Sequence, residues 1–120
     1  MSDLNFNYPF KIIEQGAQQT YEENMAENPE RLKLAEFLFS KQQLSINLQK
    51  AGLSNAEILN ILKAVTSPKK MSAVLAKYKI PERTIPLVVD VTMINAIYRA
   101  LSENPALETQ ELNNLELDEH

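Results

Sequence analysis

The sequence predicts an all-α protein: a compact bundle of about five helices followed by a disordered acidic C-terminal tail. Apolar residues recur at helical spacing along most of the chain, and residues that start or stop helices separate these periodic segments. The 120 residues, 44% hydrophobic and 23% charged, have the length and balance of one globular domain. We therefore expect a flexible N-terminus over 1–9, a helical bundle domain over 10–104 and an acidic mobile tail over 105–120.

Two helices are expected in the first half of the chain. The first spans about 10 to about 25, with apolar residues at Phe10, Ile13, Ala17 and Tyr21. Asn28 and Pro29 predict the start of the second helix, because Asn caps free backbone N–H groups and a proline in the first turn sacrifices no hydrogen bond. Its apolar residues are Leu34, Phe37, Leu38, Leu44, Leu48 and Ala51. We expect Gly52 to end this helix, and we allow a break near Ser45.

A pair of short helices is expected next. Ser54 and Glu57 form the pattern of a capping box, in which each side chain satisfies a backbone N–H at the start of a helix. Ser67 and Pro68 give a second start signal, and Pro81 is expected to end the helix that follows. Each helix has four apolar residues on one face: Ile58, Ile61, Leu62 and Val65, then Met71, Val74, Leu75 and Tyr78. The two segments are therefore a matched helical hairpin.

The last expected helix is apolar over most of its circumference. We expect Thr84 to cap it, with Pro86 in its first turn and its end near Glu103. The β-branched run 88–91 could also form a strand, but no second strand of comparable quality is present to pair with it. A helix this apolar is either central to a bundle or buried in a second subunit, so helix 85–103 is a candidate homodimer interface.

Charge is divided along the chain, although the net charge is only −4. From Glu103 onward there are six acids and no Lys or Arg. Between residues 57 and 83 there are six bases and two acids. The bases are Lys63, Lys69, Lys70, Lys77, Lys79 and Arg83. Such a division steers binding partners without identifying them.

Residues that carry common enzyme chemistry are scarce. There is no cysteine, there are two glycines, and the single histidine is His120 at the end of the chain. These counts argue against a thiolate zinc site, a phosphate-binding glycine loop and histidine catalysis. Glu22, Glu23 and Glu27 are expected to form a solvated acidic face, and Asp90 to point out of the bundle or to cap a neighbouring element. We therefore predict no catalytic residue, no metal and no cofactor.

The helical hairpin over 54–80 supports an alternative function as a helix-turn-helix DNA-binding regulator. Lys69 and Lys70 open its second helix and Lys77 lies farther along it, so all three could approach DNA phosphates. That helix contains no Arg, Asn or Gln to read base edges, and the chain as a whole is acidic. Lysines alone predict binding without sequence preference.

The preferred function is a non-catalytic protein-interaction module that binds and inhibits a partner enzyme. Phe37, Leu38 and Phe39 are consecutive, so they cannot all face one core, and we expect Phe39 to remain available to a partner. The expected contact region is Phe39 with the basic residues Lys69, Lys70 and Lys77. No apolar run approaches the roughly 20 residues that span a bilayer, and no secretory signal opens the chain, so we expect a cytosolic protein where it is made.

The C-terminal segment ENPALETQELNNLELDEH, with clustered glutamates and a few leucines, resembles the export signals of Legionella Dot/Icm type IV effectors. The helical body, rich in Asn, Gln, Lys and Ile, is similar in style to small Legionella proteins that regulate other effectors, including the inhibitor of ubiquitin-targeting deamidase and transglutaminase effectors. The resemblance implies a metaeffector that blocks access to a ubiquitin-modifying enzyme. It also implies synthesis in the bacterial cytoplasm and secretion into a host cell by a type IV system. It implies no site residue.

Overall fold

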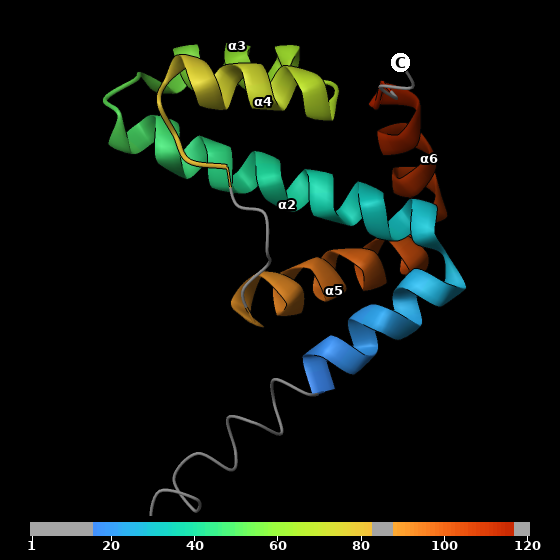
Figure 1. The fold of residues 1–120 in the computed structure, drawn as a ribbon. Coiled ribbons are helices and arrows are strands. Elements are labelled where there is room, and N and C mark those ends of the chain that lie inside the picture. Colours follow the sequence, from blue (N-terminus) through green and yellow to red (C-terminus); the bar gives the residue numbers. More distant parts are fainter. Residues whose placement is uncertain (1–15, 83–87, 117–120) are drawn as a thin grey trace, which may run out of the picture.

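The computed structural model describes residues 16–82 and 88–116. Within these ranges every regular element is a helix, which confirms the all-α class. A helical segment over 16–27 comes first. The helices that follow are α2 (Pro29–Lys50), α3 (Asn55–Ala64), α4 (Pro68–Lys77), α5 (Val88–Glu103) and α6 (Pro105–Asn114). Figure 1 shows α2 running through the middle, with α3 and α4 on one side and α5 on the other.

The core consists of two apolar clusters, and α2 contributes to both. The first lies between α2 and α5, and its buried members are Leu32, Leu34, Ala35, Phe39, Ile94, Tyr98 and Leu101. The second lies where α3 and α4 cover the C-terminal half of α2, and its buried members are Leu44, Leu48, Ile58, Val65 and Met71. α2 is therefore the central helix of the bundle. The sequence had offered that place to the segment 85–103, as the alternative to burial in a second subunit.

The central position of α2 corrects the expectation for Phe39. Phe37 packs against the second cluster, whereas Leu38 packs against the first and Phe39 is a buried member of it, with only 7% of its surface exposed. Consecutive apolar residues can all be buried when a helix has a core on two sides. The prediction that Phe39 remains at the surface was wrong for this reason. α2 also continues through Ser45, whose hydroxyl donates a hydrogen bond to the Gln42 carbonyl at 2.8 Å.

Most helix starts lie where the sequence predicted them. The Asn28 side chain accepts a hydrogen bond from the backbone N–H of the third helical residue of α2, and the Ser67 side chain does the same at α4. The capping box at α3 is complete: Ser54 accepts from the Glu57 N–H at 3.2 Å, and the Glu57 carboxylate accepts from the Ser54 N–H at 3.0 Å. Gly52, with a φ of 94°, follows the end of α2 as expected.

α4 ends before Pro81, where the sequence had placed its end. Lys79 adopts a left-handed conformation with a φ of 58°. Its N–H donates to the Ala76 carbonyl at 3.2 Å, and the Ile80 N–H donates to the Leu75 carbonyl at 2.8 Å. This pair of bonds is a Schellman motif, which closes α4 at Lys77.

α5 is helical across the β-branched run 88–91, as preferred over a strand. Its inner side, which includes Val91, Ile94, Tyr98 and Leu101, packs against α2. Val89 and Met93 are exposed on its outer side, so a second subunit would meet only a narrow apolar strip there. The homodimer stays a prediction. The expected cap Thr84 and Pro86 lie outside the described residues.

The segment after Pro105 differs from the expected mobile tail, because it is helical as far as Asn114. Asn104 caps α6, and Glu108 binds Arg31 of α2 through two hydrogen bonds, of 2.6 and 3.1 Å. Leu112 and Leu115 then pack against the first cluster. These contacts join residues far apart in the sequence, so local periodicity could not reveal them. Residues 117–120 lie outside the described part of the chain.

Candidate interaction surface

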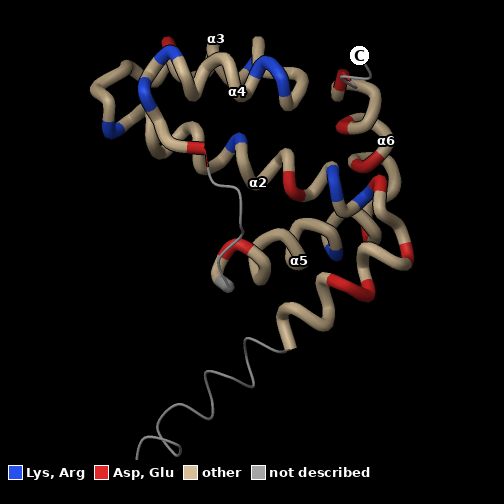
Figure 2. The backbone as a smooth tube through the Cα atoms, in the orientation of Figure 1, with Lys and Arg blue, Asp and Glu red and all other residues tan. Residues whose placement is uncertain are grey.

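The three lysines expected to bind a partner lie on the outer side of α4. Lys69, Lys70 and Lys77 are exposed, and the residues between them on the same side, Ala73 and Ala76, are exposed as well. The opposite side of α4 carries Met71, Val74, Leu75 and Tyr78, which pack on the second cluster. Figure 2 shows basic residues along α4 and acidic residues on 16–27 and α6, whereas the first turns of α2 carry residues of both signs. We call the outer side of α4, defined by these three lysines and two alanines, the basic face.

α4 is capped at both ends. The Ser67 hydroxyl is buried and accepts from the Lys70 N–H at 3.1 Å, while the Lys79 turn closes the other end. The Lys77 ammonium lies 5.5 Å from the centre of the Tyr78 ring, within the range of a cation–π contact. The lysine side chains are therefore carried by an ordered helix whose inner side is buried.

The C-terminal end of the described chain reaches this face, which the sequence did not reveal. The Glu116 N–H donates to the Thr66 carbonyl at 2.7 Å, and the Thr66 hydroxyl donates to the Glu116 carboxylate at 2.8 Å. Lys70 Nζ donates to the two Glu116 oxygens at 3.0 and 3.1 Å. The pKa of Glu116 is lowered mainly by the hydrogen bond from Thr66 and next by the hydrogen bond from Lys70. The only sequence signal for this contact was the opposite charge of the two segments.

Phe39 does not belong to the basic face. It lines a separate groove of about 400 Å³ between α2, α4 and α5, together with apolar residues that include Met71 and Ile94. Three carboxylates, from Glu36, Glu82 and Asp90, also line this groove. Phe39 thus lies apart from the three lysines with which it was expected to form one contact region.

Asp90 is buried in the first turn of α5, so it does not point out of the bundle. A carboxylate in that position is favoured by the helix dipole. Across the groove, Glu36 accepts a hydrogen bond of 2.9 Å from the Tyr21 hydroxyl. The pKa of Tyr21 is raised to about 12, mainly because the side chain is partly buried and next because it donates a hydrogen bond to Glu36. These carboxylates thus lie in a folded, hydrogen-bonded part of the bundle.

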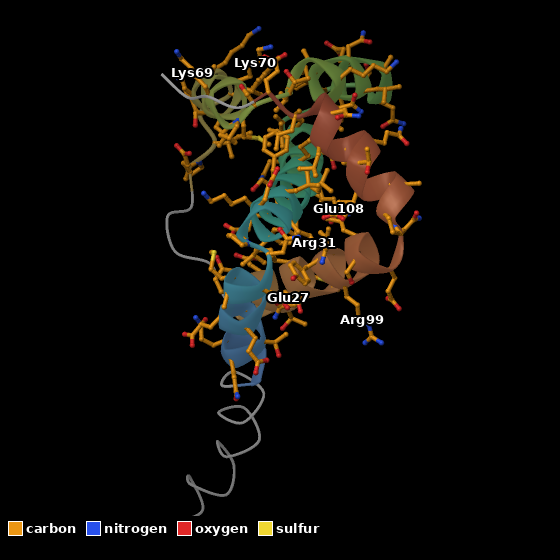
Figure 3. The ribbon with its side chains drawn as sticks, turned by 90° about the vertical axis from the view of Figure 1, so that its right-hand side faces the viewer. Glu27, Arg31, Lys69, Lys70, Arg99 and Glu108 are labelled. Atoms are coloured by element: carbon orange, nitrogen blue, oxygen red, sulfur yellow. The ribbon has the colours of Figure 1, made fainter. Side chains whose placement is uncertain are left out.

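A second ionic cluster anchors α6 and lies away from the basic face (Figure 3). Besides its bond to Glu108, Arg31 lies 5.2 Å from the centre of the Tyr98 ring, and the Tyr98 hydroxyl donates to Glu27. The hydrogen bond that Arg31 donates to Glu108 is the main cause of the raised pKa of Arg31. Burial, followed by the hydrogen bond to Glu27, raises the pKa of Tyr98. With 18% and 14% of their side chains exposed, Arg31 and Glu108 form a largely buried pair. Its geometry indicates a role in holding the bundle together.

The described residues offer ionic and apolar surfaces to a partner. Within 16–82 and 88–116, no group of three or more His, Cys, Asp or Glu residues is arranged to hold a metal ion. In the same ranges, every buried side-chain N or O atom has a hydrogen-bond partner. No helix in this part of the chain has both the length and the apolar character needed to cross a membrane.

Comparison with known proteins adds no further guide to this surface. No protein-family model, curated protein or solved structure matches the chain.

Proposed function

We propose that this chain is a protein-interaction module that binds and inhibits a partner enzyme, with its basic face placed against an acidic surface of that partner. The observation that carries the proposal is the exposed row of Lys69, Lys70 and Lys77 on a helix whose other side is packed into the core. Cationic faces attract acidic surfaces during encounter and fix their orientation once bound.

The side chains between the lysines support a protein as the partner. Ala73 and Ala76 are small and exposed, so a second backbone or helix can approach α4 closely between the cations. Ammonium groups on either side then reach carboxylates at the rim of the contact. This arrangement suits an apolar centre surrounded by ionic pairs, which is the usual anatomy of a protein interface.

DNA fits the same face less well. The sequence of α4 lacks the Arg, Asn and Gln side chains that read base edges in the major groove. In addition, the carboxylate of Glu116 lies against Lys70 and Thr66, at the end of α4 that a helix-turn-helix directs into the groove. A carboxylate there would repel phosphates. The helix-turn-helix function therefore remains the second candidate.

Inhibition is the part of the proposal that rests on the resemblance to effector regulators. A small helical module without its own reaction centre can regulate an enzyme by covering the entrance to that enzyme's site. The resemblance to small Legionella effector regulators, which include the inhibitor of ubiquitin-targeting effectors, supports a ubiquitin-modifying enzyme as the partner. The likeness of the C-terminal segment to Dot/Icm export signals supports secretion into a host cell as the setting in which the two proteins meet.

The test compares two double variants that remove the same amount of charge. In Lys69→Gln/Lys77→Gln the basic face loses two cations, whereas Lys33→Gln/Lys50→Gln removes two exposed lysines of α2. Tagged proteins are used to recover partners from lysates of the source organism and its host. We expect the wild type and the α2 variant to retain one stoichiometric protein, and the α4 variant to lose at least about tenfold in affinity, as for rim charges acting together.

Equal recovery by both double variants would contradict the proposed face. Recovery of nucleic acid that is released by added salt, with no stoichiometric protein, would favour the helix-turn-helix candidate, because phosphate contacts weaken steeply with salt. Inhibition itself is measured by adding the purified chain to the recovered enzyme. Unchanged turnover at saturating chain would reject inhibition while leaving the binding surface in place.

A further inference from the structure

The C-terminal end of the chain occupies part of the basic face. Beyond α6, Leu115 packs against the first cluster, and the next residue, Glu116, meets the turn between α3 and α4. Its carboxylate accepts hydrogen bonds from Thr66 and Lys70, and its backbone N–H binds the Thr66 carbonyl. Lys70 of the basic face is thus already paired with a carboxylate from the same chain.

The ion pair between Lys70 and Glu116 is exposed, and it is not the contact that holds α6 in place. The Lys70 and Glu116 side chains are 50% and 58% exposed, so water screens their attraction. The anchor of α6, the Arg31 and Glu108 pair, is separate and largely buried. Glu116 can therefore leave Lys70 while α6 stays in place.

The donors that hold Glu116 match those that an acidic partner would need. Lys70 provides an ammonium and Thr66 a hydroxyl, and both bind Glu116 Oε1, at 3.1 and 2.8 Å. A glutamate or aspartate side chain from another protein presents the same two oxygens to the same donors. Binding of that carboxylate and binding of Glu116 are mutually exclusive, because they use the same hydrogen atoms.

We propose that Glu116 is an internal competitor that covers Lys70 and Thr66 and is displaced when a carboxylate of an acidic partner protein binds the basic face. This regulation rests on the proposed function, because it concerns the same surface. Competition by Glu116 weakens the affinity for acidic ligands that bind only Lys70 and Thr66. A partner that also binds Lys69 and Lys77 gains enough from these contacts to displace Glu116. The exchange needs no rearrangement of the helices.

The experiment uses a fluorescein-labelled Glu-rich decapeptide as the probe and measures its affinity for the full-length chain by anisotropy at low salt. Glu116→Gln keeps the size and the backbone N–H but removes the competing charge. The matched control is Glu103→Gln, which makes the same change in net charge at an exposed site paired with Arg99. We expect Glu116→Gln to bind the peptide about two- to fivefold more tightly, the factor that one surface ion pair supplies, and the control to match the wild type.

A chain carrying Lys70→Gln distinguishes competition at this one contact from a general change in the electrostatic field around the protein. In a chain that already carries Lys70→Gln, Glu116→Gln should give no further gain, because the two substitutions act on one contact. Equal peptide affinity of Glu116→Gln and wild type, with binding still lost in Lys69→Gln/Lys77→Gln, would overturn the competition and leave the basic face standing. Failure of every variant to bind the peptide, or binding that ignores the α4 lysines, would overturn both proposals.

Discussion

Lys79 occupies a backbone conformation that suits glycine better than lysine. Its φ of 58° lies in the left-handed region, which costs a residue with a Cβ roughly 1–2 kcal/mol. The corresponding position after α2 is Gly52, with a φ of 94°. Both turns close a helix with the same hydrogen-bond pattern, so the chain offers a matched pair of sites, one with glycine and one without.

Lys79→Gly is expected to stabilise the protein by about 0.5–1 kcal/mol, the strain relieved less the entropy that glycine loses on folding. Gly52→Ala is expected to destabilise it by about 1 kcal/mol for the opposite reason. Chemical denaturation followed by circular dichroism checks both changes. A lower unfolding midpoint for Lys79→Gly would show that the lysine side chain stabilises the turn by more than its backbone strain costs.

The raised pKa of Tyr21 predicts that the folded protein loses stability at high pH. Its pKa in the folded protein is about 12, above the ordinary value of 10.0, because it is partly buried and donates to Glu36. A group whose pKa is raised by folding contributes stability that is present below its unfolded pKa and disappears as pH rises through the folded one. We therefore expect stability to fall between about pH 10 and pH 12.

Titration of phenolate absorbance checks this expectation, because the signal of Tyr21 should appear later than that of an ordinary tyrosine. Tyr21→Phe removes this part of the pH dependence and serves as the control. If the variant and the wild type lost stability equally between these pH values, the interaction with Glu36 would not be responsible.

At the scale of elements, α6 depends on one largely buried ion pair. Arg31→Ala leaves Glu108 without its two hydrogen bonds and removes the contact with the Tyr98 ring. We expect a destabilisation of about 1–3 kcal/mol, since a mostly buried carboxylate loses its partner. Arg99→Ala breaks the exposed pair with Glu103 and should change stability by less than about 0.5 kcal/mol.

Thermal unfolding of the two arginine variants gives the comparison directly. Hydrogen exchange adds a local reading, because the amides of α6 should lose protection in Arg31→Ala well before those of α2. Equal stability of Arg31→Ala and Arg99→Ala would mean that α6 is held by its apolar contacts alone.

The elements also show which features of the fold were open to prediction. The starts of α2, α3 and α4 followed from Asn28, Ser54 and Ser67, because a cap acts on backbone groups within one turn of its own residue. The helical state of 105–114 did not follow, since Glu108 finds its partner in Arg31, 77 residues earlier in the chain. Local chemistry can be read from a sequence, whereas a contact across the fold depends on the path of the chain between its two ends.

At the scale of the whole molecule, the positions of the α4 lysines followed from local spacing, whereas the position of Phe39 depended on how the helices pack. The lysines of α4 share one exposed side because helical spacing places them there. Phe39 was assigned to the surface on the assumption of one core, and the second cluster around Leu44 and Leu48 made that assumption wrong. Glu116 was missed because it belongs to a segment with weak periodicity whose position is set by packing against the first cluster.

The division of charge between the two sides of the bundle is the property that links fold to proposed function. Basic residues gather along α4, while acidic residues gather on 16–27 and α6 (Figure 2). An acidic partner is therefore attracted to one side of the molecule and repelled by the other. This asymmetry predicts a single orientation of binding.

The most direct test is zero-length cross-linking of the chain to the partner recovered from lysate, followed by mass spectrometry of the joined peptides. The reagent couples amines to carboxylates in contact, so it reports which lysines meet acidic residues of the partner. We predict links from Lys69, Lys70 and Lys77, and none from Lys33 or Lys50 on α2. Links confined to the α2 lysines would contradict the basic face of α4 as the site of interaction.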